Sequence, residues 1–150
     1  MLTRLLTVVV LGATAVGWYG AGSSTGSTRS TSTFHSVVVA KLTGTAEVGA
    51  GSPTGYGTAR ITLNLKTGKA CWKLVVKRLD TTLSAHVHRA LPGKTGPVVI
   101  PLGARFSATG CVTAPEKSLR AVGRNPRAYY VNVHTRRYLN GAIRGRLRVG

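Results

Sequence analysis

Between Thr58 and Lys66 the residues alternate strictly between apolar and polar. A period of two is the spacing of a β-strand with one buried and one exposed face, so this segment predicts a strand. Thr67-Gly68 is typical of a tight turn, and Lys69 to Leu79 returns as a second strand, which predicts a β-hairpin. The inward face of the first strand is predicted to consist of Ala59, Ile61, Leu63 and Leu65.

The rest of the chain contains similar short segments, separated by turns rich in glycine and proline. About seven or eight such segments predict an all-β domain, built as an antiparallel Greek-key sandwich or barrel. The further predicted strands are Val37 to Leu42, the stretch that follows a turn at Asp80 to Thr82, Val98 to Leu102, Arg105 to Thr113, Tyr129 to Thr135, and Ala142 to Val149.

One short α-helix is predicted near residues 115–123. Thr113 is a candidate N-cap, and Pro115 suits an early helical position because its missing N–H has no partner there in any case. Gly123 and the Asn125-Pro126 pair are expected to end the helix. The helix is thus the exception in a chain of strands.

Residues 1–22 have the pattern of an export signal peptide, in which Arg4 precedes the apolar run Leu5 to Leu11 and small residues follow. Residues 23–36 are rich in serine, threonine and glycine and predict a flexible linker, so the folded domain is expected over 37–150. The apolar run is shorter than the about 20 residues that span a bilayer. We therefore expect a secreted protein with no transmembrane span after cleavage; an uncleaved N-terminal anchor is the alternative.

The two cysteines, Cys71 and Cys111, both lie out of phase with the apolar face of their segments. Successive residues of a strand face opposite sides, so both thiols are expected to point outward. We expect a disulfide between neighbouring strands, as is common in oxidising compartments. It would close a loop of about 40 residues and stabilise the fold by roughly 3 to 4 kcal/mol. The alternative is that the cysteines take part in a metal site.

Three histidines are expected to share the face of the sheet that is opposite the core. His86 and His88 are two residues apart and point the same way, while His134 shares a face with Tyr130 and Asn132. If the two strands are neighbours, the three imidazoles come together in a geometry able to bind copper or zinc. The alternative is that these rings are solvated, or hydrogen-bond to one another, to Asn132 or to backbone carbonyls.

The chain carries 21 Lys and Arg against three acidic residues, a formal net charge of +18. Such a charge attracts polyanions, so an anionic polymer or surface is a candidate partner. No helix-turn-helix pattern or aromatic-rich basic motif predicts specific nucleic-acid binding. A solvated, aggregation-resistant edge is the alternative interpretation. The arginines expected to form an outward cationic patch are Arg136, Arg137, Arg144, Arg146 and Arg148.

Taken in order, these segments resemble the CHRD domain, named after chordin and also found in secreted bacterial proteins. The resemblance covers Val37 to Val149. One departure is Gly49, where the family pattern usually has proline, and another is the small number of acidic residues. The matching segments are LTGTAEV at 42–48, GTARITLNL at 57–65, TGKACWKLVVKRL at 67–79, AHVH at 85–88, GPVVIPL at 96–102, GCVT at 110–113, NPRAYYVNVHT at 125–135 and GAIRGRL at 141–147.

The resemblance implies an extracellular β-sandwich module, with an immunoglobulin-like or superoxide-dismutase-like architecture. In chordin such domains accompany growth-factor-binding repeats, so an extracellular ligand, not identified by the sequence, is implied. The strand with His86 and His88 is also similar to the copper-ligand strand of Cu/Zn superoxide dismutase. That similarity concerns a few residues, so the chemistry must be argued from the site itself.

Two functional classes follow. The first is a binding or structural module with a three-histidine copper or zinc site formed by His86, His88 and His134. The second is a superoxide-dismutase-like metalloenzyme, which usually needs carboxylates to orient the imidazoles; the three acidic residues are distant in sequence from every histidine. The sequence shows no paired carboxylates and no reactive-thiol context that would predict hydrolytic chemistry. A non-catalytic module is therefore the preferred prediction.

Overall fold

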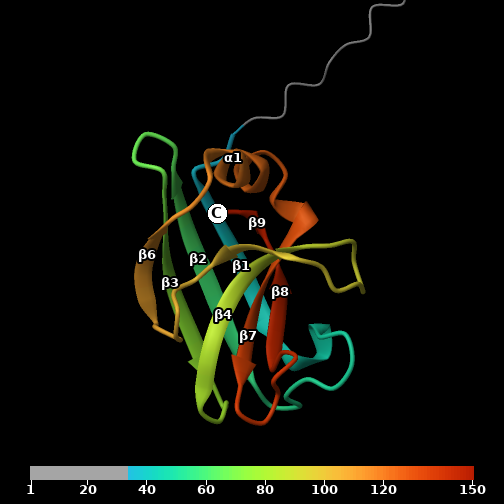
Figure 1. Cartoon of the computed structure of the whole chain (residues 1–150). Helices are drawn as coiled ribbons and strands as arrows, with labels where there is room; N and C mark the ends of the chain where they lie inside the picture. Colours follow the sequence, from blue (N-terminus) through green and yellow to red (C-terminus); the bar gives the residue numbers. More distant parts are fainter. Residues whose placement is uncertain (1–33) are drawn as a thin grey trace, which may run out of the picture. The chain divides into compact units, whose positions relative to one another are not determined.

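The structure, a computed structural model, describes residues 34–150 (Figure 1). The predicted signal peptide and the predicted linker lie outside the described residues, apart from the last three residues of the linker. Of these, Phe34 packs against the core, and the backbone N–H of His35 donates to the carbonyl of Gly123. Among the described residues, no helix is both long and apolar enough to cross a membrane.

Within residues 34–150, nine strands form one antiparallel sheet in the order β5-β4-β7-β8-β1-β2-β3-β6, with β9 paired to β1. The sheet curls into a nearly closed barrel, which confirms the predicted all-β fold (Figure 1). Some neighbouring strands, such as β4 and β7, are distant in sequence, which requires the long connections expected of a Greek-key domain. The strands are β1 (Val37–Thr43), β2 (Tyr56–Asn64), β3 (Lys69–Lys77), β4 (Thr82–Arg89), β5 (Val98–Pro101), β6 (Thr109–Thr113), β7 (Tyr129–Thr135), β8 (Ile143–Arg146) and β9 (Arg148–Val149).

The predicted hairpin is formed by β2 and β3, whose register places Ile61 opposite Trp72. Along β2 exposed and buried residues alternate without exception, as the sequence pattern requires. Gly68 in the turn has a φ of 64°, a left-handed conformation that glycine adopts at little cost. The inward side chains of this hairpin pack into the same core as those of β1, β4 and β7.

The single α-helix of the described residues, α1 (Glu116–Arg124), lies close to its predicted position. Its N-cap is Pro115 and not Thr113, so the predicted cap was wrong. Gly123 does not end the helix but lies inside it, one residue before its last residue. A Cβ added at Gly123 would be 2.4 Å from the Phe34 ring. Glycine at this position therefore serves close packing. Leu119 is buried beneath the helix.

Two predicted strands are shorter in the structure. The segment expected from Arg105 is extended only from Thr109 onward, as β6. The last predicted strand is divided into β8 and β9, and Val149 is 49% exposed although the alternation placed it inward. The alternation was extended past a break in the strand at Leu147. The backbone N–H of Leu147 still donates to the carbonyl of Tyr129, but the residues after it pair with β1.

Cys71 and Cys111 form a disulfide and are direct partners in the register of β3 and β6. Their Cα atoms are 4.0 Å apart, and neither side chain belongs to the buried core. Because both sulfurs are bonded to each other, neither is a ligand for a metal ion. The alternative in which the cysteines join the histidines in one site is therefore wrong.

Candidate metal centre

The strands β4 and β7 pair directly, which brings the two histidine segments together. His86 is opposite Asn132, His88 is opposite Tyr130, and Ser84 is opposite His134. Directly paired residues of an antiparallel sheet lie on the same face, so all three imidazoles project from one side. The opposite face of both strands is buried in the core through Ala85, Val87, Val131 and Val133.

The three histidine rings form one compact cluster. One ring nitrogen of each histidine lies within 4.8 Å of those of the other two. The ring centroid of His86 is 5.6 Å from that of His88 and 5.0 Å from that of His134, and the latter two centroids are 6.4 Å apart. All three side chains are half-buried. The cluster is therefore compact enough to be a candidate site for a single ion.

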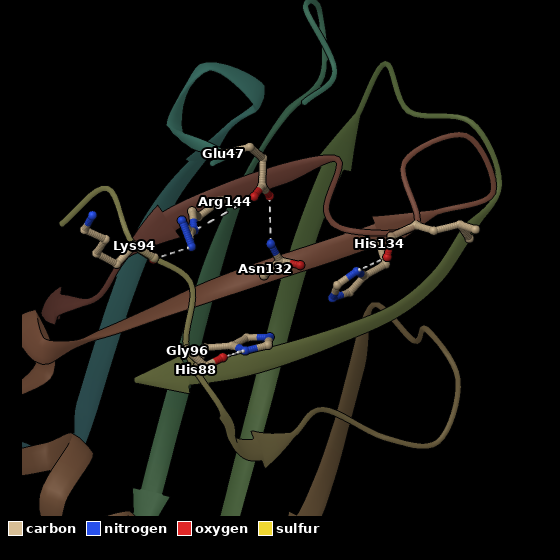
Figure 2. Close-up of polar contacts among 8 residues, drawn as sticks. Glu47, His88, Lys94, Gly96, Asn132, His134 and Arg144 are labelled. Atoms are coloured by element: carbon tan, nitrogen blue, oxygen red, sulfur yellow. Dashed lines mark hydrogen bonds and ion pairs between the residues drawn. The ribbon is translucent and has the colours of Figure 1, made fainter. Parts of the chain in front are cut away.

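Two of the imidazoles are oriented by backbone carbonyls, as Figure 2 shows. Nδ1 of His88 lies 2.9 Å from the Gly96 carbonyl oxygen, and Nδ1 of His134 lies 2.9 Å from the Leu139 carbonyl oxygen. A carbonyl oxygen only accepts, so both Nδ1 atoms donate, which leaves the lone pair of each neutral ring on Nε2.

Three buried ring nitrogens have no hydrogen-bond partner among residues 34–150: Nε2 of His88, Nε2 of His134 and Nδ1 of His86. We call these the open nitrogens. A buried polar atom without a partner is costly, and the large majority of such atoms in proteins are satisfied. Three of them in one cluster make it a candidate ligand site.

The surroundings favour neutral imidazoles. Burial lowers the pKa of His86 to about 4, with further lowering by the nearby His134 and His88. Burial also lowers the pKa of His88, assisted by His134 and Arg144 and opposed by the hydrogen bond to Gly96. Near pH 7 both rings are therefore in the neutral form, which is the form that binds a metal ion.

Arg144 on β8 lies on the same face as the histidines but is only 5% exposed. Its guanidinium carbon is 3.8 Å from the centroid of the Tyr130 ring, and that ring stacks on His88 with a centroid separation of 4.9 Å. Nη2 of Arg144 donates to the Lys94 carbonyl (Figure 2). Arg144 faces away from the core, as predicted, but it is not exposed, because the loop between β4 and β5 contacts this face.

Glu47 is a member of the site that sequence reasoning missed. It directly follows the short 3₁₀ helix η1 (Gly44–Ala46), and its Oε1 accepts a hydrogen bond of 2.8 Å from Nδ2 of Asn132 (Figure 2). Its Oε2 is 3.9 Å from Nε of Arg144. Burial raises the pKa of Glu47 to about 7, although Arg144 acts in the opposite direction. The one signal was that Glu47 lies in the family segment at 42–48; its contacts could not be predicted, because they depend on how a loop folds back over the sheet.

The five arginines expected to form one patch lie on β8, on β9 and in the turn after β7. Arg146 is paired with Tyr130 near the start of β7. Arg136 and Arg137 follow its end at Thr135, where the backbone N–H of Arg137 donates to Asp80. With a rise of about 3.3 Å per residue, the two groups are roughly 15 to 20 Å apart. Of the predicted patch of Arg136, Arg137, Arg144, Arg146 and Arg148, Arg144 is buried, whereas polyanion binding by the other four stays a prediction.

Comparison with known proteins gives one match. The family model of the CHRD domain matches residues 38–147, which is most of the chain and includes all three histidines of the cluster. Searches of curated proteins and of solved structures found no match. Strands β2 to β8, the disulfide and the histidine pair on β4 all lie within the matched residues. The chain therefore belongs to the CHRD-domain family.

Proposed function

We propose that this CHRD domain is an exported module that binds one copper or zinc ion through His86, His88 and His134. The observation that carries the proposal is the set of open nitrogens, one from each histidine, with ring nitrogens within 4.8 Å of one another. Imidazole is a ligand suited to both metals. The alternative, in which the three rings only support neighbouring strands, accounts for the two Nδ1 hydrogen bonds but leaves the open nitrogens unexplained.

The dimensions suit an ion of this class after a small adjustment. Bonds from zinc to histidine nitrogen are about 2.0 to 2.1 Å, so two ligand nitrogens on one ion are at most about 4.2 Å apart. The ring nitrogens of the three histidines lie within 4.8 Å of one another, so they must move closer by a few tenths of an ångström to bind one ion. Rotation of a half-buried imidazole supplies this movement without any change in the paired strands.

The hydrogen bonds around the cluster resemble those that support metal ligands in general. A ligating histidine usually donates its other ring N–H to a carbonyl or carboxylate, which fixes the tautomer and the ring orientation. His88 and His134 both do so, through Gly96 and Leu139. Three protein ligands leave a fourth position for water or a small ligand. Copper(II) is expected to bind more tightly than zinc, following the general order of divalent metals.

Export is supported by two separate observations. The N-terminal segment has the pattern of a signal peptide, and the disulfide between Cys71 and Cys111 is a bond that persists mainly in oxidising compartments. An exported domain meets metal ions outside the cytoplasm. The protein is therefore expected to bind its ion after translocation.

The test is metal analysis of untagged protein, followed by titration of the metal-free protein with copper(II) and with zinc. The wild type is expected to bind one ion per chain. His86→Ala, His88→Ala and His134→Ala each remove one open nitrogen. Each is expected to lower the affinity by more than the roughly 10-fold to 100-fold that loss of an outer hydrogen-bond partner costs.

His35→Ala is the matched control, because His35 contacts the domain through its backbone N–H and is not part of the cluster. It is expected to bind metal as the wild type does. Circular dichroism verifies that each variant is folded. If folded His88→Ala protein binds copper and zinc as tightly as the wild type, the proposed site is wrong.

A further inference from the structure

A second concentration of functional groups lies apart from the histidines, on arginines that the metal centre does not use. They surround two shallow hollows between the start of β7, the end of the chain and the loop that follows β4. We call this region the arginine surface. It consists of Arg89, Arg124, Arg127, Arg146 and Arg148.

The two hollows are contiguous and strongly basic. The larger has a volume of about 570 Å³ and includes Arg89, Arg127 and Arg146. The smaller has a volume of about 400 Å³, and both hollows share Asn125 and Arg127. Among the described residues that line them, none is acidic. No carboxylate among the described residues of the walls therefore offsets the charge of Arg89, Arg127, Arg146 and Arg148.

The walls of the larger hollow are fixed by hydrogen bonds. Nη1 of Arg146 donates to the Ala90 carbonyl at 2.9 Å and to the Arg127 carbonyl at 2.7 Å. The backbone N–H of Ala90 donates to the Ala128 carbonyl at 3.2 Å. These bonds join the loop after β4 to the 3₁₀ helix η2 (Pro126–Ala128). A surface built in this way loses little conformational freedom when a ligand binds.

The chemistry of the larger hollow is mixed. Opposite the arginines its lining is apolar and includes Ala90, Leu91, Pro92 and Pro97, of which Leu91 is 75% exposed. Guanidinium groups bind sulfate and carboxylate in bidentate fashion. An exposed apolar side chain beside them suits the C–H face of a sugar ring. Proteins that bind single-stranded nucleic acid use aromatic stacking platforms, and no described residue lining either hollow is aromatic.

We propose that the arginine surface binds an acidic polysaccharide, with the anionic groups on the arginines and a sugar ring against Leu91 and Pro92. This activity is independent of the metal centre, since the surface and the histidine cluster share no residue. The arginine surface overlaps with the patch predicted from sequence. Arg146 and Arg148 remain members, while Arg136, Arg137 and Arg144 are not among the lining residues.

The test uses the metal-free full-length chain and measures its affinity for four probes over a range of NaCl concentrations. The probes are heparin, polygalacturonate, inorganic polyphosphate and single-stranded DNA. The triple variant Arg89→Gln, Arg127→Gln, Arg148→Gln removes exposed guanidinium groups and leaves the Arg146 hydrogen bonds intact. It is expected to weaken binding of both polysaccharides at least tenfold. The salt slope is expected to decrease by about one for each arginine removed.

The matched control is the triple variant Arg60→Gln, Lys73→Gln, Lys77→Gln, which removes the same charge from exposed positions of β2 and β3. It is expected to retain polysaccharide affinity within about twofold of the wild type. Leu91→Ser leaves the charge unchanged and is expected to weaken binding of the polysaccharides but not of polyphosphate. It serves as the second variant, in case the first triple variant does not fold.

Three results would overturn the proposal. Equal losses in the two triple variants would mean that net charge alone attracts the probes. Tighter binding of DNA or polyphosphate than of either polysaccharide would assign the surface to a different polyanion. Absence of binding to both polysaccharides at low salt would exclude the activity. Since all measurements use metal-free protein, none of these outcomes depends on the histidine site.

Discussion

At the scale of single residues, Asn132 connects the histidine cluster to the loop above it. Its neighbours across the sheet are His86 on β4 and Arg144 on β8. Its side chain is buried, and its Nδ2 donates to Glu47 (Figure 2). The loop after η1 is thus tied to the same strand face as the imidazoles. Substitutions at Glu47 are expected to alter the packing of side chains on this face as well as the overall stability.

Glu47→Gln tests the electrostatics of this contact. Burial raises the pKa of Glu47 from 4.5 to about 7, so the folded state binds this proton more tightly than the unfolded state does. The stabilising contribution is complete below pH 4.5 and is lost as the pH rises through 7. Relative to the wild type, Glu47→Gln should gain up to about 3 kcal/mol of unfolding free energy between pH 4.5 and 8.

Urea unfolding of both proteins across this pH range measures the difference. Glu116→Gln is the control, because the Glu116 side chain is exposed at the start of α1 and is expected to show no comparable change. Using the difference from the wild type removes the contribution of the histidines, whose lowered pKa values act in the opposite direction. A difference that does not vary with pH would contradict the raised pKa of Glu47.

Gly141 is required next to this contact for two reasons. Its φ is 134°, and a Cβ there would lie 2.5 Å from Nδ2 of Asn132 and 2.6 Å from Oε1 of Glu47. Gly141→Ala should therefore destabilise the fold by about 1 to 3 kcal/mol. Gly68→Ala is the matched control, since Gly68 also has a positive φ but has open space around it. Equal losses in the two variants, measured by urea unfolding, would show that crowding contributes nothing.

The face of the sheet on which a side chain lies could be predicted from sequence, whereas its burial beneath a loop could not. The period of two placed His86, His88 and His134 on one face, and β4 and β7 do pair so as to join them. The same reasoning placed Arg144 on the face opposite the core, where it lies, but did not predict that it is buried. The difference arises because alternation reports which side of a strand a residue is on. It does not report whether a loop, here the one with Lys94, lies over that side.

At the scale of elements, β4 and β7 form the platform of the candidate site, and β3 and β6 carry the disulfide. The short hairpin β2–β3 was predictable because its strands are adjacent in sequence and alternate without a break. The division of the last segment into β8 and β9 was not predictable, because the backbone changes its partner strand at Leu147 while the residue pattern continues.

The disulfide is expected to affect stability but not the metal site. The double variant Cys71→Ser, Cys111→Ser removes a link of sequence separation 40, so its unfolding free energy should fall by about 3 to 4 kcal/mol. The copper stoichiometry should remain at one ion per chain, because neither sulfur belongs to the histidine cluster. Urea unfolding and copper titration of the variant provide the two measurements. A variant that is folded but has lost copper binding would mean that the disulfide positions the cluster.

At the scale of the whole molecule, one barrel presents two chemically different regions. The histidine cluster gathers ring nitrogens on β4 and β7, while the arginine surface gathers charge beside η2 and the chain end. The net charge of +18 predicted an affinity for anions but could not indicate which arginines are accessible. That depends on tertiary contacts, such as those that bury Arg144 and half-bury Arg146. Both regions lie on a domain whose family and fold the sequence did predict.

Anomalous X-ray diffraction at the copper absorption edge, on crystals of copper-loaded protein, tests the central claim most directly. The predicted result is a single strong peak per chain, at about 2.0 to 2.1 Å from one nitrogen each of His86, His88 and His134. Crystals of copper-treated His88→Ala protein should lack this peak. A copper peak elsewhere on the chain, with the three imidazoles unligated, would contradict the proposed metal centre.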